Sequence, residues 1–195
     1  MISGLEGVSS GSIRLSEKLA KEGFGFVFQD SVLFPWKTVR ENVAFPLEIK
    51  GDPDGTGQKR VEELLSIVGL DKFASSYPKE LSGGMRQRAS IARSLSYDPN
   101  VLLMDEPFGA LDALTRDSLN VELRNIWSKT NKTIIFVTHD IDEAVFLSTK
   151  VVVLSGRPAS VHAVVPIELM QNRELSIRSD TSFRAYADKL RGMLE

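Results

Sequence analysis

Three short apolar runs of the chain read as β-strands, and polar residues follow each of them. The runs are Phe24–Phe28, Val101–Met104 and Thr133–Val137, and the first two are expected to be buried. Two further apolar runs, Val151–Leu154 and Ser160–Val165, flank a turn and predict a hairpin.

Segments of helical periodicity separate these strands. Ser82 is a predicted N-cap, and Asp140 with Glu143 predicts a capping-box-like helix start. The spacing of apolar residues predicts three more helices. The first covers residues 61–68 and ends at Gly69, and the second covers residues 119–127. The third lies at the C-terminus, and one face of it carries Phe183, Tyr186, Ala187, Leu190, Met193 and Leu194. We interpret that last face as a cover for the core, with a docking surface as the alternative.

Turn-forming residues mark two segments expected to lack regular structure. Pro35 and Pro46 interrupt residues 30–50, and residues 51–58 read as a surface loop. Alternating strands and helices predict an α/β fold with a mainly parallel sheet. We expect a single domain over residues 1–195, with a helical subdomain over residues 30–97.

The composition indicates a globular protein and excludes a few classes of partner and of location. Of 195 residues, 42% are hydrophobic and 26% charged, which predicts a globular core. The net charge of −2 argues against nucleic acid as a partner. The chain has no cysteine, and its apolar runs are too short to cross a bilayer. We also see no signal peptide, so any membrane association is expected to run through a partner protein.

The segment LSGGMRQR (Leu81–Arg88) is the most distinctive motif. Two glycines just inside a helix start allow close backbone approach, so that free N–H groups, the helix dipole and the Ser82 hydroxyl face an anion. An ordinary N-cap followed by two loop glycines is the alternative.

Acidic residues end the second predicted strand. Asp105 would lie at the carboxyl edge of a parallel sheet, where it can hold Mg²⁺, and Glu106 can act as a general base. His139 follows the third strand, from which it can reach a terminal phosphate. Two surface acids and a structural histidine are the alternatives.

The order of these motifs resembles that of the ATP-binding subunits of ABC transporters. The resemblance runs from near residue 1 to about Val165. It implies a P-loop NTPase-like fold, ATP and Mg²⁺ as cofactors, ATP hydrolysis, and a second ATP-binding subunit as partner. The resemblance also implies a role for each site residue. Gln29 would be the Q-loop contact to Mg²⁺ and water, Asp105 the Walker B aspartate and Glu106 the catalytic base. The signature motif would contain Ser82, Gly83, Gly84 and Gln87, while Asp112 would belong to the D-loop and His139 would be the switch histidine.

Three longer segments resemble the nitrate, sulfonate and taurine branch of the importers. They are Gln29–Trp36, Met104–Arg116 and Thr138–Ser148. The resemblance implies transmembrane permease partners that dock past Gln29, near Leu33–Trp36, and an indirectly associated solute-binding protein. The chain would then lie peripherally on the cytoplasmic face of the cell membrane. Core filling is the alternative for Leu33–Trp36, above all for Phe34.

The phosphate-binding motif G-x-x-x-x-G-K-S/T does not occur in the sequence. Residues 51–59 imitate it, but Gln58 separates Gly57 from Lys59, and Arg60 stands where a hydroxyl is needed. In the family, a segment similar to Ile2–Glu6 follows the P-loop helix, so we expect a chain that starts one helix late and lacks the P-loop strand. Such a chain alone should bind ATP poorly and aggregate.

Three readings of the function follow. The first is an importer ATPase subunit, and the second is a catalytically dead partner that donates only its signature face to an intact copy. A soluble ABC protein of DNA repair or translation is third, disfavoured by the importer-like Gln29–Trp36 segment. Nitrate, a sulfonate, taurine or a heterocyclic vitamin precursor all stay open as the solute.

Overall fold

The computed structural model describes residues 2–17, 19, 23–52 and 55–194, and it divides into two compact units. Unit 1 comprises Met1–Asp112 and Ile126–Val137, and unit 2 comprises Ala113–Asn125 and Thr138–Glu195. The long helix α5 (Ala113–Thr130) contributes to both. No helix within the described ranges combines the length and the apolar character needed to span a bilayer.

Unit 1 contains a parallel sheet in the order β1-β2-β3. Its strands are β1 (Phe24–Val27), β2 (Val101–Asp105) and β3 (Thr133–Val137). Phe26, Leu103 and Ile135 pair in one row of the sheet. The parallel α/β fold predicted from the alternation is confirmed, although β1 stops one residue before the expected end and leaves Phe28 45% exposed.

One face of this sheet is buried and the other is not. Val27, Leu102 and Met104 are buried, whereas Ile135 and Val137 on the opposite face are 38% and 51% exposed. On the buried face, a Cβ at Gly25 would lie 2.8 Å from the backbone oxygen of Ser94, so only glycine lets β1 approach helix α4 (Gly83–Leu95) this closely.

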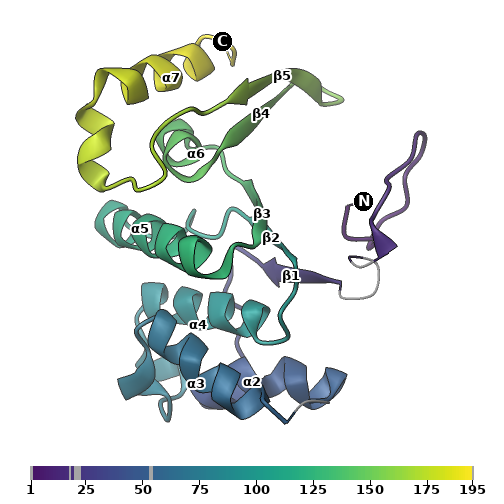
Figure 1. Ribbon diagram of the computed structural model, residues 1–195, viewed down its shortest axis with the longest axis vertical. Coiled ribbons are helices and arrows are strands. Elements are labelled where there is room, and N and C mark those ends of the chain that lie inside the picture. The colour runs from purple at the N-terminus through teal and green to yellow at the C-terminus, as the bar shows by residue number, and fades with distance from the viewer. Residues whose placement is uncertain (1, 18, 20–22, 53–54, 195) are drawn as a thin grey trace. The chain divides into compact units, whose positions relative to one another are not determined.

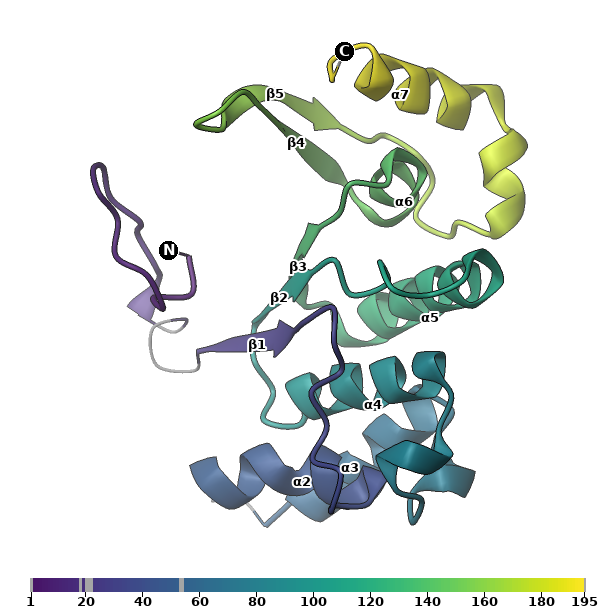
Figure 2. The same cartoon turned by 180° about the vertical axis from the view of Figure 1, so that it is seen from behind.

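Helices form the rest of unit 1, and Figures 1 and 2 show them stacked on one side of β1. They are α2 (Val39–Lys50), α3 (Gly57–Ile67) and α4 (Gly83–Leu95), with short 3-10 helices η1 (Asp71–Phe73) and η2 (Pro78–Glu80) between α3 and α4. Between Asp30 and Tyr97 the described residues contain no strand.

Helix α2 corrects the prediction that residues 30–50 are irregular. Thr38 and Glu41 form a complete capping box, in which each side chain bonds the other's backbone N–H. This start and the burial of Val39 and Val43 outweigh the break expected from Pro46, which lies inside the helix. The surface loop predicted over residues 51–58 is also wrong at its end, since α3 begins at Gly57, whose N–H bonds the Asp52 carboxylate at 2.9 Å.

Unit 2 holds a β-hairpin and two helices around a second core. Strands β4 (Lys150–Ser155) and β5 (Ser160–Pro166) pair antiparallel, as predicted. Helices α6 (Ile141–Leu147) and α7 (Thr181–Arg191) pack with the inner hairpin face, and η3 (Leu175–Ser179) precedes α7. The core contains Val145, Phe146, Val153, Val165, Ile167, Phe183, Ala187 and Leu190. The C-terminal helix therefore covers the core, but Leu194 lies beyond its end and is 54% exposed, contrary to the prediction.

Candidate functional site

Ser82 caps α4 as predicted, and the two glycines form its first turn. The Ser82 hydroxyl accepts a hydrogen bond from the N–H of Met85 at 3.2 Å, while the residue itself is exposed. A Cβ at Gly83 would lie 3.1 Å from Cδ2 of Leu111. Since Asp112 directly follows Leu111, the signature segment and the start of the predicted D-loop approach each other within unit 1.

The carboxyl edge of the sheet carries two of the predicted catalytic residues. Asp105 is the last residue of β2, pairs with Val137 and is exposed. The N–H of Glu106 donates to the Val137 oxygen at 3.0 Å. Glu106 has a φ of +40°, a left-handed conformation that is strained for a residue other than glycine. Such strain persists only where neighbours enforce it, and here the bond to β3 does so.

Gln29 and Glu106 converge on Gly109. A Cβ at Gly109 would lie 3.3 Å from the Gln29 Nε2 and 3.4 Å from the Glu106 Oε2. The predicted Q-loop glutamine and the predicted base therefore share one small space at the sheet edge, and a glycine leaves that space open.

Gln87 occupies a different environment from the rest of the signature segment. It is 3% exposed, and its Nε2 donates to the backbone oxygen of Phe28 at 2.9 Å. Its amide thus holds the residue that precedes Gln29. Direct contact of Gln87 with a nucleotide stays a prediction.

Arg93 is a second tie between α4 and the Q-loop, and sequence analysis missed it. Its guanidinium donates to the backbone oxygens of Ser31 at 3.1 Å and Val32 at 2.7 Å. Burial lowers the pKa of Arg93 below its ordinary value. Nothing in the sequence separates Arg93 from the other arginines of this helix, because its acceptors are backbone atoms about sixty residues away.

The segment past Gln29 exposes an aromatic ring. Trp36 is 70% exposed and lies against Phe34, with ring centroids 5.5 Å apart. Phe34 in turn packs edge-on against Phe45 of α2 at 4.5 Å. The fully buried Asn42 fixes this turn, since its side chain bonds the backbone of Phe34, Lys37 and Thr38. Phe34 fills the helical layer while Trp36 stays at the surface.

His139 belongs to unit 2, where it is exposed in the turn that leads into α6. The Asp140 side chain caps α6 by accepting from the Glu143 N–H at 3.0 Å. In a capping box the Glu143 side chain would accept from the Asp140 N–H. Here the Thr138 hydroxyl accepts from that N–H instead, at 3.0 Å. Arg116 of α5 pairs with the Asp140 carboxylate at 3.2 Å.

Mg²⁺ would find oxygen ligands only in part. Asp105 offers an exposed carboxylate and Gln29 an amide oxygen, both of the hard oxygen type that Mg²⁺ prefers. No group of three acidic, histidine or cysteine side chains able to hold a metal occurs among the described residues. This donor set fits an ion that is held mainly by water and phosphate.

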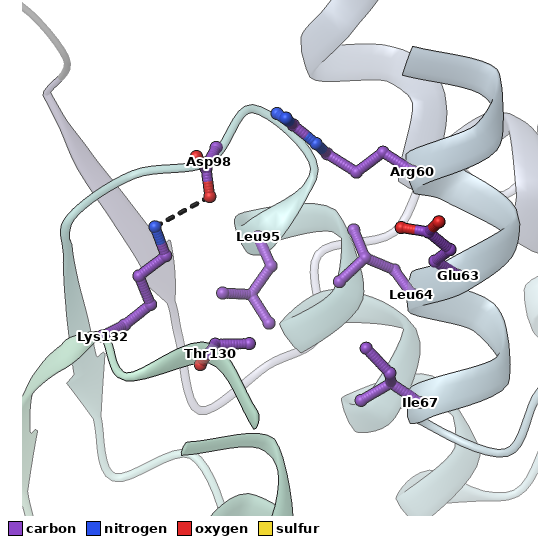
Figure 3. A pocket seen from close by; sticks show the side chains of 8 residues that line it. All are labelled: Arg60, Glu63, Leu64, Ile67, Leu95, Asp98, Thr130 and Lys132. Carbon is purple, nitrogen blue, oxygen red and sulfur yellow. Dashed lines mark ion pairs between the residues drawn. The ribbon is translucent and has the colours of Figure 1, made fainter. Parts of the chain in front are cut away.

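A pocket of unit 1 contains none of the predicted site residues (Figure 3). It has a volume of about 200 Å³, and the ion pair between Lys132 and Asp98, at 2.7 Å, borders it. Its walls also include Arg60, Glu63, Leu64, Ile67, Leu95 and Thr130. With a salt bridge at its rim and apolar side chains beside it, the pocket shows no convergent set of catalytic groups.

Comparison with known proteins decides the family. A family profile described as "ABC transporter" matches residues 1–109. This chain belongs to the ABC transporter family. It is similar to the aliphatic sulfonates import ATP-binding protein SsuB of Bacillus cereus (strain ATCC 10987 / NRS 248), with 48% identity over 94% of the chain and 73% of that relative.

Two further ABC proteins support the assignment. The taurine import ATP-binding protein TauB of Rhizobium johnstonii is 43% identical over 99% of the chain and 77% of its own length. The solved structure of cbiO1 from Clostridium perfringens, part of the ABC transporter complex cbiONQ, has a TM-score of 0.69 and 30% identity over 77% of the chain. The matched part spans 64% of that solved chain, less than two thirds of its length.

Proposed function

We propose that this ABC protein is the ATP-binding subunit of an importer and couples ATP hydrolysis to the uptake of a small anion. The convergence of Gln29 and Glu106 on Gly109, at the end of a parallel sheet, carries the proposal. The sulfonate and taurine named for its relatives support an anion of this class, alongside nitrate.

The residues divide the chemistry among them. Asp105 and Gln29 would hold Mg²⁺ with its water ligands, and the ion would neutralise charge on the transferred phosphoryl group. Glu106 would accept a proton from the attacking water. His139 would contact the terminal phosphate, while Ser82, Gly83, Gly84, Gln87 and Asp112 would form the surface that closes over a nucleotide. Residues 30–97 would act as the helical subdomain of one domain over residues 1–195.

The partners follow from the same surfaces. A second ATP-binding subunit would complete the nucleotide site in a two-fold dimer. A transmembrane permease would dock at Leu33–Trp36, where the exposed indole of Trp36 offers an apolar contact. A solute-binding protein would act indirectly, and the subunit would lie on the cytoplasmic face of the cell membrane.

A second candidate is a subunit that donates only its signature face. It is supported by one observation: Gly83 lies close to Leu111, the neighbour of Asp112, so the residues of the signature face stay together. In that case ATP bound by the P-loop of an intact partner is hydrolysed by the partner's own base, and Glu106 of this chain is a bystander.

A mixing experiment tests both candidates. The ATPase rate of the chain with an intact sulfonate-import homologue is compared with the rate of each alone. Ser82→Arg should remove any gain under either candidate, because it blocks the closing surface. Glu106→Gln removes the gain only if this chain catalyses. No gain from mixing, together with no hydrolysis by the chain alone, would overturn both.

A further inference from the structure

A polar cluster behind His139 has no place in the chemistry proposed so far. It consists of Thr138, Asp140 and Glu143 from the turn and first residues of α6, with Arg116 and Asn120 from α5. All five residues belong to unit 2. His139 lies in the middle of the turn that they surround.

Glu143 is the most unusual member, since it is an acid that is only 4% exposed. A carboxylate is almost never buried this deeply unless polar partners surround it. Its own N–H is already bound to Asp140, and its side chain lies next to the Thr138 hydroxyl and the Asn120 amide. The burial thus places this acidic side chain against the base of the His139 turn.

Asn120 meets Glu143 from α5 and is fully buried. Neither its amide atoms nor the Glu143 Oε1 reaches hydrogen-bonding geometry with a described residue. We therefore count the Asn120–Glu143 approach as an electrostatic contact rather than a formed hydrogen bond. Separating the two would leave buried polar groups without even that compensation, so the contact opposes movement of α6 away from α5.

The other half of the cluster is held by an ion pair and two hydrogen bonds. Arg116 pairs with Asp140 at 3.2 Å, one turn of α5 before Asn120. Asp140 uses its second oxygen to cap α6, and its N–H is held by Thr138. Both neighbours of His139 are thus held in place: Asp140 pairs with Arg116, and Thr138 contacts Glu143.

We propose that Glu143 is a positioning residue, which with Asn120 and Arg116 sets the place of His139. This inference rests on the proposed role of His139 at the terminal phosphate. Its physical content, a turn held in one conformation by a buried carboxylate, concerns unit 2 alone and needs no nucleotide.

Nuclear magnetic resonance of the chain can test this without any ATPase assay. The sequence has two histidines, His139 and His162, so a His162→Gln variant assigns both imidazole signals. His162 lies on β5 of the same unit and reports whether unit 2 is folded. The second readout is hydrogen exchange of the Asp140 amide, which bonds the Thr138 hydroxyl.

Glu143→Ala should shift or broaden the His139 signal and speed exchange of the Asp140 amide about tenfold, with the His162 signal in place. Glu143→Gln, which keeps the shape and one acceptor, should have a smaller effect of the same kind. Asp142→Asn is the matched control, because this neighbouring carboxylate is only partly buried and pairs with Arg191. It should change neither readout.

An unchanged His139 signal and Asp140 exchange in Glu143→Ala would overturn the inference. If Glu143→Ala also moves the His162 signal, unit 2 has unfolded and Glu143→Gln decides in the same way. The mixing experiment is independent, so hydrolysis can fail to appear while the positioning effect is observed.

Discussion

The side-chain amide of Gln87 is bonded to the backbone oxygen of Phe28 across 59 positions of sequence. This bond joins the signature helix α4 to the residue before Gln29. Arg93, nearly two turns further along the helix, bonds the backbone oxygens of Ser31 and Val32 on the other side of Gln29. Within unit 1, the position of the Q-loop backbone is therefore set by side chains of the signature helix.

Gln87→Leu should destabilise unit 1 by about 1–3 kcal/mol, because it leaves a backbone oxygen of Phe28 without its donor. Urea unfolding measures the change. Gln58→Leu, at an exposed position of α3, is the matched control and should stay within about 0.5 kcal/mol of the wild type. Equal stability of the two variants would show that the Gln87 bond contributes nothing.

Glu106→Gly should raise the free energy of unfolding by up to about 1 kcal/mol, since glycine adopts a φ of +40° without strain. Glu106→Ala keeps the strain and should not share the gain. Thermal unfolding of both variants measures the difference. Because both variants lack the carboxylate, a Glu106→Gly variant no more stable than Glu106→Ala would contradict a strain cost at this φ.

Glu143→Gln should alter the pH dependence of stability. Burial chiefly raises the pKa of Glu143, with Asp140 adding to the rise and Thr138, Arg116 and Asn120 opposing it. A raised pKa in the folded state means that the wild type loses stability as the pH rises from the ordinary glutamate range through the raised value. Glutamine cannot titrate, so the variant should gain relative to the wild type over that window.

Denaturant unfolding of both proteins between about pH 4 and pH 8 measures the contribution of Glu143 to the free energy of unfolding. The contributions of the other titratable groups cancel when the two proteins are compared. A difference that stays constant over the whole range would contradict the raised pKa.

Arg173→Met should destabilise unit 2 by at least about 3 kcal/mol. The Arg173 side chain donates to five backbone oxygens, three of which close the C-terminal end of α6: those of Val145, Phe146 and Ser148. Burial, together with the nearby Arg124, lowers its pKa to about 10. Arg184→Met, at an exposed position of α7, is the control. A loss no larger than that of Arg184→Met would mean that water replaces these bonds.

Strands and caps were predictable because their signals are local. Each strand is a short apolar run, and the cap at Ser82 depends on residues within one helical turn. Pro46 predicted a break in α2, but the capping box of Glu41 and Thr38, five and eight residues earlier, starts a helix that continues through it. The candidate site residues themselves were predicted from the sequence motifs and from the resemblance to the family.

Long-range contacts were beyond the sequence. The roles of Asn42, Arg93 and Arg173 depend on backbone oxygens that their side chains reach only after folding. The burial of Glu143 and Gln87 could not be inferred either, because isolated polar residues on helices are usually exposed. Asn42, Gln87, Arg93 and Arg173 bond backbone atoms, which are the same for every residue type, so no sequence motif marks these contacts.

The outward face of the sheet in unit 1 has a practical consequence for work at the bench. Phe28, Ile135 and Val137 present apolar surface there, and β3 is an outer strand of the described sheet. The purified protein should therefore increase the fluorescence of dyes that bind apolar surface. Its sedimentation coefficient should rise with protein concentration. Mild detergent or charged substitutions at Ile135 and Val137 are the first remedies, and they leave every proposed site residue untouched.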